Sequence, residues 1–218
     1  ALGSILQRLR QAFDLDADPA LIDPVLATMP GKPRPGIRVP GGMDGFEIAV
    51  RAILGQQVSV AAARTLTLRL VERFGAELAT PFPALNRLFP DAATLAAARP
   101  DFIGKLGIVR QRVRALQALA TAVADERIAL HRGAPLKTTI EALRALPGIG
   151  EWTAEIIAMR ALAWPDAFPA SDIGVLKGLG TRDVGHVKAL AQAWRPWRSY
   201  AVMHLWQTPE DGSCKSTD

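Results

Sequence analysis

Apolar residues recur at intervals of three or four through most of the chain, which is the spacing of helices with one buried face. No segment alternates apolar and polar residues as a half-buried strand does. One helical stripe in the middle of the chain consists of Val113, Leu116, Ala120 and Val123. The pattern therefore predicts an all-α fold. The expected helices cover residues 2–13, 19–26, 44–54, 59–74, 91–98, 101–106, 109–124, 138–146 and 151–163.

Polar residues mark where several of these helices begin. Asp44 with Glu47, and Thr138 with Glu141, have the spacing of a capping box, so we expect helices to start at Asp44 and at Thr138. The hydroxyl of Ser59 can cap the helix that follows it. These three side chains give the predicted helices defined starting points.

The stretch 146–154 joins two predicted helices and reads Leu-Pro-Gly-Ile-Gly-Glu-Trp-Thr-Ala. Pro147 cannot easily continue the first helix, and Gly148 and Gly150 permit dihedral angles closed to other residues, so the chain turns tightly here. A second helix begins at the end of the turn. The sequence thus predicts a helix-hairpin-helix unit over about residues 138–163.

Such a hairpin leaves unpaired backbone N–H groups at the start of its second helix, where the helix dipole is positive. This arrangement suits an anion such as a phosphate. Gly148 and Gly150 allow a nucleic-acid backbone to come close, and we expect the hydroxyl of Thr153 to add a hydrogen bond. A sharp turn without any ligand is the alternative that these residues leave open.

Composition narrows the class of protein. The chain has 218 residues with 49% hydrophobic content, which is enough to bury a sizeable core. The formal net charge is +5 and the sequence pI is about 9.9, which favours an anionic partner without identifying one. The basic residues gather in two groups, one of Lys105, Arg110, Arg112 and Arg114 and one of Arg182, Lys188, Arg195 and Arg198.

Neither a membrane segment nor a metal centre built from side chains is indicated. No run of about 18 apolar residues occurs, and the first residues lack the pattern of a signal peptide, so we expect a cytoplasmic protein. Cys214 is the only cysteine, which excludes an iron–sulfur cluster with four cysteine ligands. His131, His186 and His204 are scattered without the spacing of metal ligands.

Three motifs carry a resemblance to a known family. They are Ala-Ile-Leu-Gly-Gln-Gln-Val-Ser at 52–59, the hairpin sequence at 146–154, and Trp-Arg-Pro-Trp-Arg-Ser-Tyr-Ala at 194–201. With a proline-containing loop that leads to Asp172, the chain resembles the helix-hairpin-helix DNA glycosylases and, more narrowly, the 3-methyladenine DNA glycosylase II (AlkA-type) family. The resemblance runs from about residue 6 to residue 206.

The resemblance implies roles for four residues. Asp172 would be the catalytic aspartate, although aspartate is also a preferred helix N-cap and one residue can serve as both. Trp152 and Trp206 would flank Asp172 and receive the flipped base, and packing of both in the core is the alternative. Gln57 would be the wedge that enters the duplex where the damaged nucleotide leaves, unless it is only a polar residue at a helix end.

The implied reaction needs one carboxylate. Breaking an N-glycosidic bond passes through an oxocarbenium-like sugar that a nearby carboxylate stabilises, and an alkylated base that carries positive charge leaves readily. Relatives that also nick the strand have a lysine at the position of Trp152; an indole forms no imine, so we expect a monofunctional enzyme that leaves an abasic site. No cofactor is required, but the resemblance suggests a sodium or potassium ion on the backbone carbonyls of Arg144, Leu146 and Ile149.

We expect two helical lobes with DNA in the cleft between them. Residues 44–164 would form one lobe, and residues 1–43 with 165–218 the other. The resemblance also suggests that the N-terminal β-rich domain of longer family members is absent. Ile156 and Gly174 replace larger side chains, so we expect a more open pocket and a broader or shifted substrate range.

The sequence therefore predicts a monomer that excises alkylated bases, of the 3-methyladenine and 7-methylguanine type, from double-stranded DNA in base excision repair. Two alternatives stay open. One is a DNA-binding helix-hairpin-helix module without catalysis, and the other is a glycosylase for deaminated or oxidised bases. Salt-sensitive DNA binding fits all three, so it does not separate them.

Overall fold

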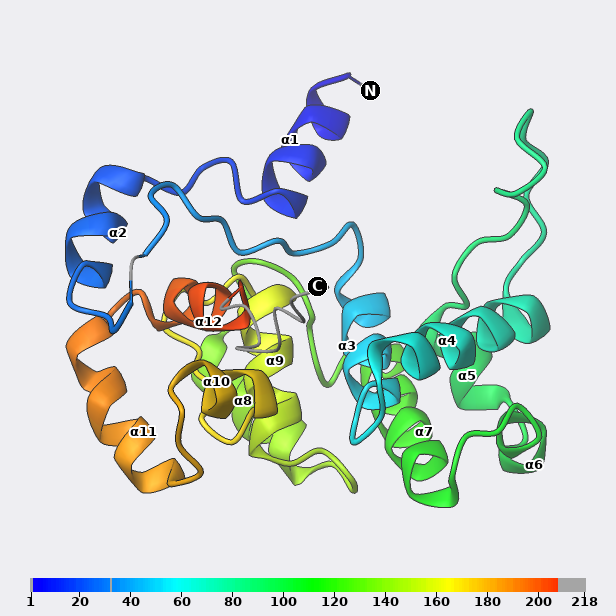
Figure 1. The fold of residues 1–218 in the computed structure, drawn as a ribbon. Coiled ribbons are helices and arrows are strands. Elements are labelled where there is room, and N and C mark those ends of the chain that lie inside the picture. Colours follow the sequence, from blue (N-terminus) through cyan, green and yellow to red (C-terminus); the bar gives the residue numbers. More distant parts are fainter. Residues whose placement is uncertain (1, 32, 208–218) are drawn as a thin grey trace, which may run out of the picture.

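The computed structural model of the chain describes residues 2–31 and 33–207 (Figure 1). Cys214 lies outside these residues. The described chain is helical and holds no strand beyond one antiparallel bridge between Glu77 and Arg87, so the predicted all-α fold is confirmed. The helices are α1 (Leu2–Ala12), α2 (Pro19–Leu26), α3 (Gly45–Leu54), α4 (Val60–Phe74), α5 (Ala92–Ala97), α6 (Pro100–Gly104), α7 (Arg110–Ala124), α8 (Leu136–Ala145), α9 (Glu151–Arg160), α10 (Ile173–Gly178), α11 (Val184–Leu190), the 3-10 helix η1 (Ala191–Trp194) and α12 (Arg198–Gln207).

Two of the predicted helix starts are confirmed. The carboxylate of Asp44 accepts the N–H of Glu47 at 2.7 Å and thereby caps α3. The hydroxyl of Ser59 accepts the N–H of Ala62 at 3.2 Å and caps α4. In both cases a short polar side chain satisfies an N–H group that the helix itself leaves unpaired.

The predicted start of α8 is wrong. This helix begins at Leu136, and no side chain caps its first N–H groups. Thr138 lies inside the first turn, where its hydroxyl donates to the carbonyl of Pro135 at 3.0 Å. A threonine hydroxyl can bond to a carbonyl behind it as well as to an N–H ahead of it, and sequence spacing does not distinguish the two.

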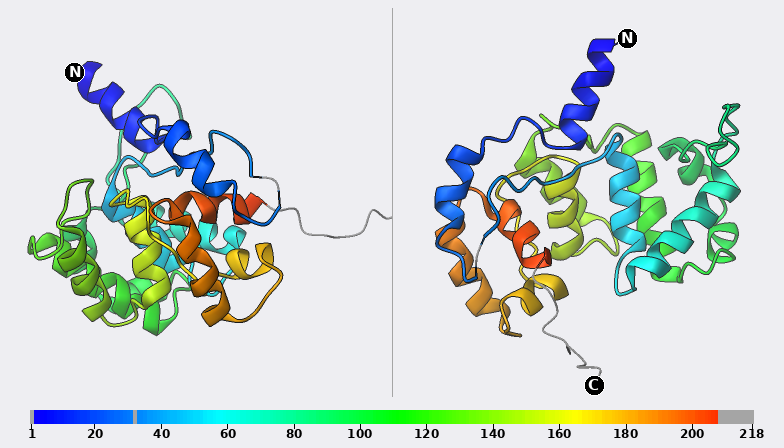
Figure 2. Two further views of the ribbon diagram at one scale, coloured as in Figure 1. Left: turned by 90° about the vertical axis from the view of Figure 1, so that its left-hand side faces the viewer. Right: turned by 45° about the horizontal axis from the view of Figure 1, so that its top comes forward.

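The helices gather in two groups with α3, α8 and α9 between them (Figure 1). Helices α4 to α7 lie on one side, while α2, α10, α11 and α12 lie on the other. Figure 2 shows α2 beside the C-terminal helices, and α2 contacts both η1 and α12. The predicted division at residues 44–164 is not tested by this arrangement and stays a prediction.

One continuous cluster of buried side chains runs through both groups of helices. Helix α9 contacts α3 and α8, while α3 also contacts α7, so the hairpin rests on the centre of the molecule. None of the helices in residues 2–31 and 33–207 has the length and apolarity that crossing a membrane requires. The largest side chains with almost no exposure include Trp194, Ile22, Leu26, Ile53, Leu54 and Leu70.

A buried ion pair anchors the loop between α9 and α10 to the start of α12. Nε of Arg198 donates to Oδ1 of Asp166 at 2.6 Å, and Nη2 of Arg198 donates to the Asp166 carbonyl at 2.7 Å. Next to it, the Ser199 hydroxyl donates to the carbonyls of Trp164 and Ala167 at 2.7 and 3.0 Å. The loop that leads to Asp172 is therefore held by side chains of the motif at 194–201.

Ion pairs within the protein engage most of the second basic group. Arg195 shares Asp166 with Arg198, since its Nη1 donates to Oδ2 of Asp166 at 2.8 Å. Lys188 donates to Glu151 in the first turn of α9 at 2.8 Å. Three of the four residues in this group thus hold protein segments together, and Arg182 is the member for which the described residues offer no ion pair.

We expect Arg198→Met to lower the free energy of unfolding by about 3–5 kcal/mol, because it leaves the Asp166 carboxylate buried without its main cation. The two side chains are 11% and 9% exposed. Denaturant unfolding measures the loss. Arg127→Met is the matched control: it breaks an ion pair with Asp125 whose side chains are 58% and 56% exposed, and such a pair contributes about 0–1 kcal/mol. Equal losses in the two variants would contradict the anchoring role.

Candidate active site

The Asp172 carboxylate accepts three N–H groups. Nε1 of Trp152 donates to Oδ2 at 2.7 Å, and Nε1 of Trp206 donates to Oδ1 at 2.7 Å. The backbone N–H of Val175 also donates to Oδ1, at 3.1 Å, so Asp172 caps α10. Both functions considered for Asp172 are therefore compatible: the residue caps a helix, and its carboxylate is held between two indoles.

Three separate helices bring this cluster together. Trp152 lies in the first turn of α9, Asp172 precedes α10, and Trp206 lies near the end of α12. All three side chains are partly buried. The resemblance placed these three residues together, and the structure places them within hydrogen-bonding distance.

Gly174 and Gly178 let α10 lie directly against α12. A Cβ atom on Gly174 would lie 2.5 Å from Cδ1 of Trp206 and 3.0 Å from Oδ1 of Asp172. A Cβ on Gly178 would lie 2.7 Å from the carbonyl oxygen of Leu205. The indole of Trp206 occupies the space that a larger side chain at position 174 would fill. The broader or shifted substrate range stays a prediction. Ile156, the other residue behind that prediction, is buried.

Arg160 supports Trp206 from the end of α9 and was not found by sequence reasoning. Its guanidinium carbon lies 5.3 Å from the centroid of the Trp206 ring, a cation–π contact. Nη1 of Arg160 also donates to the carbonyl of Pro40 at 2.7 Å, and burial lowers the pKa of this guanidinium. Its partners Pro40 and Trp206 lie 120 and 46 positions away, so no local pattern in the sequence indicates this role.

Glu155 holds the other side of the loop that leads to Asp172. Its carboxylate accepts the backbone N–H of Phe168 at 2.8 Å. Burial raises the pKa of Glu155, while the hydrogen bond from Phe168 and the charge of Arg198 act in the opposite direction. Sequence reasoning missed this residue as well, because its partner lies 13 positions away in an irregular loop.

The two hairpin glycines have different functions in the structure. Gly148 has φ +79°, and a Cβ on it would lie 3.0 Å from Cβ of Ala115 on α7, so the turn needs glycine there. Gly150 is exposed, and a Cβ on it would meet no atom within 4 Å. Gly150 is the N-cap of α9, and no side chain caps that helix. No side chain thus engages the N–H groups at the start of α9, and the space beside Gly150 is open, which fits the anion-site interpretation.

The Thr153 hydroxyl does not lie at this approach. Thr153 is 2% exposed, and its Oγ1 accepts a hydrogen bond from Nε2 of Gln56 at 2.9 Å. The expected phosphate contact of this hydroxyl is therefore wrong, since the side chain points into the protein. Gln57, the predicted wedge, is exposed and has φ +53°, a left-handed conformation that few residues other than glycine adopt. Its contact with DNA stays a prediction.

The carbonyls expected to bind a cation lie at the end of α8 and in the turn. The carbonyl of Leu146 accepts the N–H of Ile149 at 3.2 Å and keeps a second lone pair. Carbonyls at a helix C-terminus carry partial negative charge, so this donor set fits a hard monovalent cation. The sodium or potassium site at Arg144, Leu146 and Ile149 stays a prediction. No group of three His, Cys, Asp or Glu side chains that could hold a metal occurs in the described ranges.

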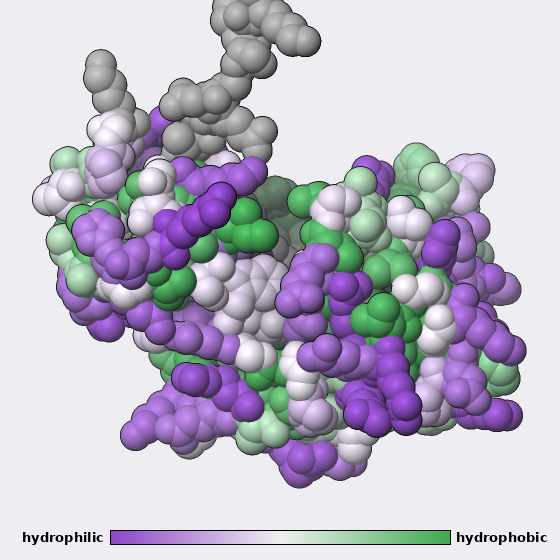
Figure 3. Space-filling view, turned by 60° about the horizontal axis from the view of Figure 1, so that its bottom comes forward, coloured by the Kyte–Doolittle hydropathy of each residue, from purple (hydrophilic) through white to green (hydrophobic). Residues whose placement is uncertain are grey.

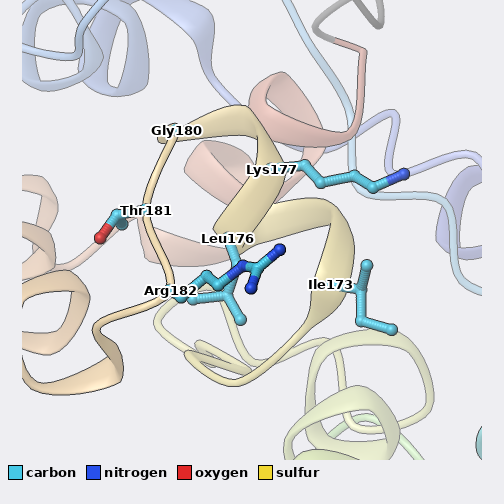
Figure 4. A pocket seen from close by; sticks show the side chains of 6 residues that line it. All are labelled: Ile173, Leu176, Lys177, Gly180, Thr181 and Arg182. Carbon is cyan, nitrogen blue, oxygen red and sulfur yellow. The ribbon is translucent and has the colours of Figure 1, made fainter.

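A hollow of about 580 Å³ is lined by residues of α10 and the loop after it, and the first of them, Ile173, follows Asp172 directly (Figure 4). It lies along α10 and the loop that follows, so it sits beside the Asp172 cluster rather than within it. The space-filling view in Figure 3 shows a hollow between the two groups of helices, where the predicted cleft would lie. The residues that line the hollow of Figure 4 are Ile173, Leu176, Lys177, Gly180, Thr181 and Arg182.

A helix-hairpin-helix followed by a loop to an indole-bound aspartate defines a class of DNA repair protein. The family described as "HhH-GPD superfamily base excision DNA repair protein" matches residues 50–197, and the chain belongs to this family. Residues 1–44, which precede this match, match a second family described as the AlkA N-terminal domain. The described part of those residues contains α1 and α2. The expected absence of a β-rich domain is not tested by this match.

Curated relatives agree with the family assignment. DNA-3-methyladenine glycosylase 2 of Escherichia coli is 36% identical over 93% of this chain and 71% of its own length. A Mycobacterium tuberculosis protein named as a probable bifunctional transcriptional activator/DNA repair enzyme AlkA is 44% identical over 93% of this chain. The chain spans only 42% of the length of that relative. The resemblance drawn from the three motifs is confirmed.

Solved structures support the same fold. The 3-methyladenine DNA-glycosylase from Archaeoglobus fulgidus aligns with a TM-score of 0.70 and 21% identity, over 94% of this chain and 74% of that one. MBOgg1, in a complex with a low-affinity DNA ligand, aligns with a TM-score of 0.78 and 19% identity, over 94% and 75%. At such identities the similarity establishes the arrangement of the helices.

The raised pKa of Glu155 predicts a pH-dependent stability. Because the folded protein holds this proton more tightly than the unfolded chain, stability falls as the pH rises from the ordinary value of 4.5 through the higher folded value. Glu155→Gln removes that dependence, while its amide oxygen can still accept the N–H of Phe168. We therefore expect the free energy of unfolding of the variant, relative to that of the wild type, to be higher at about pH 8 than at about pH 4.

Denaturant unfolding of both proteins at the two pH values measures this difference. Glu141→Gln, on the exposed surface of α8, is the control for losing a carboxylate charge. If the stability of Glu155→Gln changed between the two pH values by as much as that of the wild type, the raised pKa of Glu155 would be contradicted.

Proposed function

We propose that the chain is a monofunctional DNA glycosylase that hydrolyses the N-glycosidic bond of alkylated bases in double-stranded DNA. The observation that carries this proposal is the Asp172 carboxylate held at 2.7 Å by both Trp152 and Trp206. A helix cap needs only the backbone bond to Val175. The two additional indole bonds favour a site built to orient a carboxylate over a module that only binds DNA.

The reaction follows from the chemistry of these residues. A base inside a duplex cannot reach Asp172, so the nucleotide must rotate out of the helix, while the open N–H groups at Gly150 hold a backbone phosphate. As the bond between C1′ and the base nitrogen breaks, its electron pair leaves with the base. Positive charge develops on the sugar, and the fixed carboxylate stabilises it. Water adds to C1′ and loses its proton, which gives an abasic site.

The indoles suit an electron-poor base. Their N–H edges are engaged by Asp172, which leaves ring faces for stacking, and Arg160 covers one face of Trp206. A cationic base over an indole face gains about 0.5–2 kcal/mol. This supports alkylated purines of the 3-methyladenine and 7-methylguanine type, and 3-methyladenine is the base in the name of the E. coli relative.

Further properties belong to the same proposal. Trp152 stands where an imine-forming lysine would be needed, so strand cleavage does not accompany base release. We propose that the protein acts as a monomer on damaged DNA in the cytoplasm, within base excision repair. No cofactor takes part in the chemistry, and the carbonyls of Arg144, Leu146 and Ile149 would hold a sodium or potassium ion that stiffens the hairpin.

A glycosylase for deaminated or oxidised bases is the competing enzyme. Comparing release of 7-methylguanine, hypoxanthine and 8-oxoguanine from otherwise identical duplexes separates the two. We retain alkylated bases as the proposal because two indoles reward a cationic ring more than a neutral one.

Asp172→Asn tests the catalytic carboxylate. We expect single-turnover release of 3-methyladenine from duplex DNA to slow about a hundredfold or more, with DNA binding retained, because a preorganised charge beside the sugar is lost. Asp183→Asn is the matched control, since Asp183 caps α11 through the N–H groups of Gly185 and His186. If both variants lose the same activity, Asp172 is only a cap; if the wild type binds DNA but releases none of the tested bases, the chain is a binding module.

Gly174→Ala tests whether the position of Trp206 matters. The added methyl group would lie 2.5 Å from the indole, so Trp206 must move away from Asp172. We expect base release to slow about tenfold to a hundredfold, the effect of misplacing a catalytic group by about 1 Å. Gly104→Ala, where the methyl meets nothing within 4 Å, is the control. Wild-type release by Gly174→Ala would show that Trp206 is not part of the machinery.

A further inference from the structure

The first glutamine of the Gln56-Gln57 pair has no role in the reaction described so far. Gln56 is partly buried at the junction of α3 and α4, and its side-chain amide donates two hydrogen bonds. One goes to the carbonyl of Gly148 in the hairpin turn at 2.9 Å, and the other to Oγ1 of Thr153 at 2.9 Å. Both amide hydrogens are therefore used, and both are used on the hairpin.

The backbone of Gln56 is held as firmly as its side chain. Nη2 of Arg112 on α7 donates to the carbonyl of Gln56 at 2.6 Å. Three segments thus converge on one residue: the hairpin turn, the first turn of α9, and α7. Since a carbonyl and a hydroxyl receive the two amide hydrogens, an oxygen in the same place could not replace the amide nitrogen.

Gln57 follows directly and is exposed at the junction. Its φ of +53° is a conformation that side chains seldom adopt. A strained residue keeps its conformation only where its neighbours fix it. The bond from Arg112 fixes the peptide immediately before Gln57, and the two side-chain bonds fix Gln56 itself.

We propose that Gln57 is the wedge that enters the duplex and that Gln56 is a positioning residue that couples this wedge to the phosphate-binding hairpin. The hairpin sets where the DNA backbone lies, and Gln56 sets where the wedge lies relative to that hairpin. The wedge then acts at the nucleotide whose backbone the hairpin holds. The proposal rests on the proposed function, because it assigns Gln56 to base extrusion and not to bond cleavage.

This role predicts a dependence on how firmly the lesion is paired. A base in a complete pair must be displaced against stacking and pairing, whereas a lesion opposite a mismatched base is extruded at lower cost. Loss of the coupling therefore slows release from a paired lesion more than release from a mismatched one. A defect in Asp172 chemistry slows both equally.

Gln56→Met is the variant to test, because it keeps the side-chain length and removes both donors. We expect release from the paired lesion to slow about tenfold, as for a buried hydrogen-bond partner left unsatisfied, and release from the mismatched lesion to slow less than about threefold. Thr153→Val, which removes one acceptor of the same amide, is a second variant with the same expected pattern. Gln117→Met is the matched control. Gln117 also donates a side-chain hydrogen bond to a carbonyl, that of Ala98 at 2.8 Å, but this bond does not involve the hairpin.

Fluorescence of 2-aminopurine beside the lesion measures extrusion independently of bond cleavage. We expect the increase in fluorescence on DNA binding to be smaller for Gln56→Met than for the wild type or Gln117→Met. Equal slowing on paired and mismatched substrates, or wild-type rates on both, overturns the proposal. If the wild type releases no base at all, the proposed function fails instead, and the fluorescence comparison still decides whether Gln56 governs extrusion.

Discussion

The bond between a carboxylate and two indole N–H groups is the interaction on which the site depends. Trp152, Asp172 and Trp206 come from three helices, and each reaches the others only if α9, α10 and α12 are packed correctly. Hydrogen bonds to a charged acceptor are stronger than those between neutral groups, and they require close alignment. A shift in any of the three helices would therefore break at least one of these bonds.

The surrounding structure supplies that alignment through buried polar contacts with the loop before Asp172. Arg198 and Ser199 hold the loop from α12, and Glu155 holds it from α9. The same two helices also carry Trp206 and Trp152. The loop and the tryptophans consequently share their supports, so the carboxylate and its donors keep their relative positions when the helices move together. Such preorganisation is what electrostatic stabilisation of a transition state requires.

Local signals in the sequence were sufficient for most of the helices. Apolar spacing located α1 and α7 closely, and the caps at Asp44 and Ser59 placed the starts of α3 and α4. Thr138 and Thr153 were misjudged because a hydroxyl can bond either to a nearby backbone group or to a distant side chain, and the sequence does not show which partner is closer.

The site itself could be predicted only through family motifs, and its supports could not be predicted at all. Arg160, Glu155 and Gln56 bond to partners that lie between 13 and 120 positions away in the sequence. The periodic pattern of a single helix does not extend over such separations. Gly174 is instructive for a different reason. Its missing side chain looked like extra space, yet in the fold a neighbouring indole fills that space. Volume at a site depends on the three-dimensional neighbours, which composition does not reveal.

The hydrogen bonds at Asp172 also decide which oxygen would take part in the proposed reaction. A carboxylate offers about four lone-pair positions, two on each oxygen. Oδ1 accepts from both Trp206 and Val175, so its positions are filled, whereas Oδ2 accepts only from Trp152. One lone pair therefore stays available, on Oδ2. The two indoles thus both hold the carboxylate and leave a single direction from which it can orient a water molecule or approach the sugar.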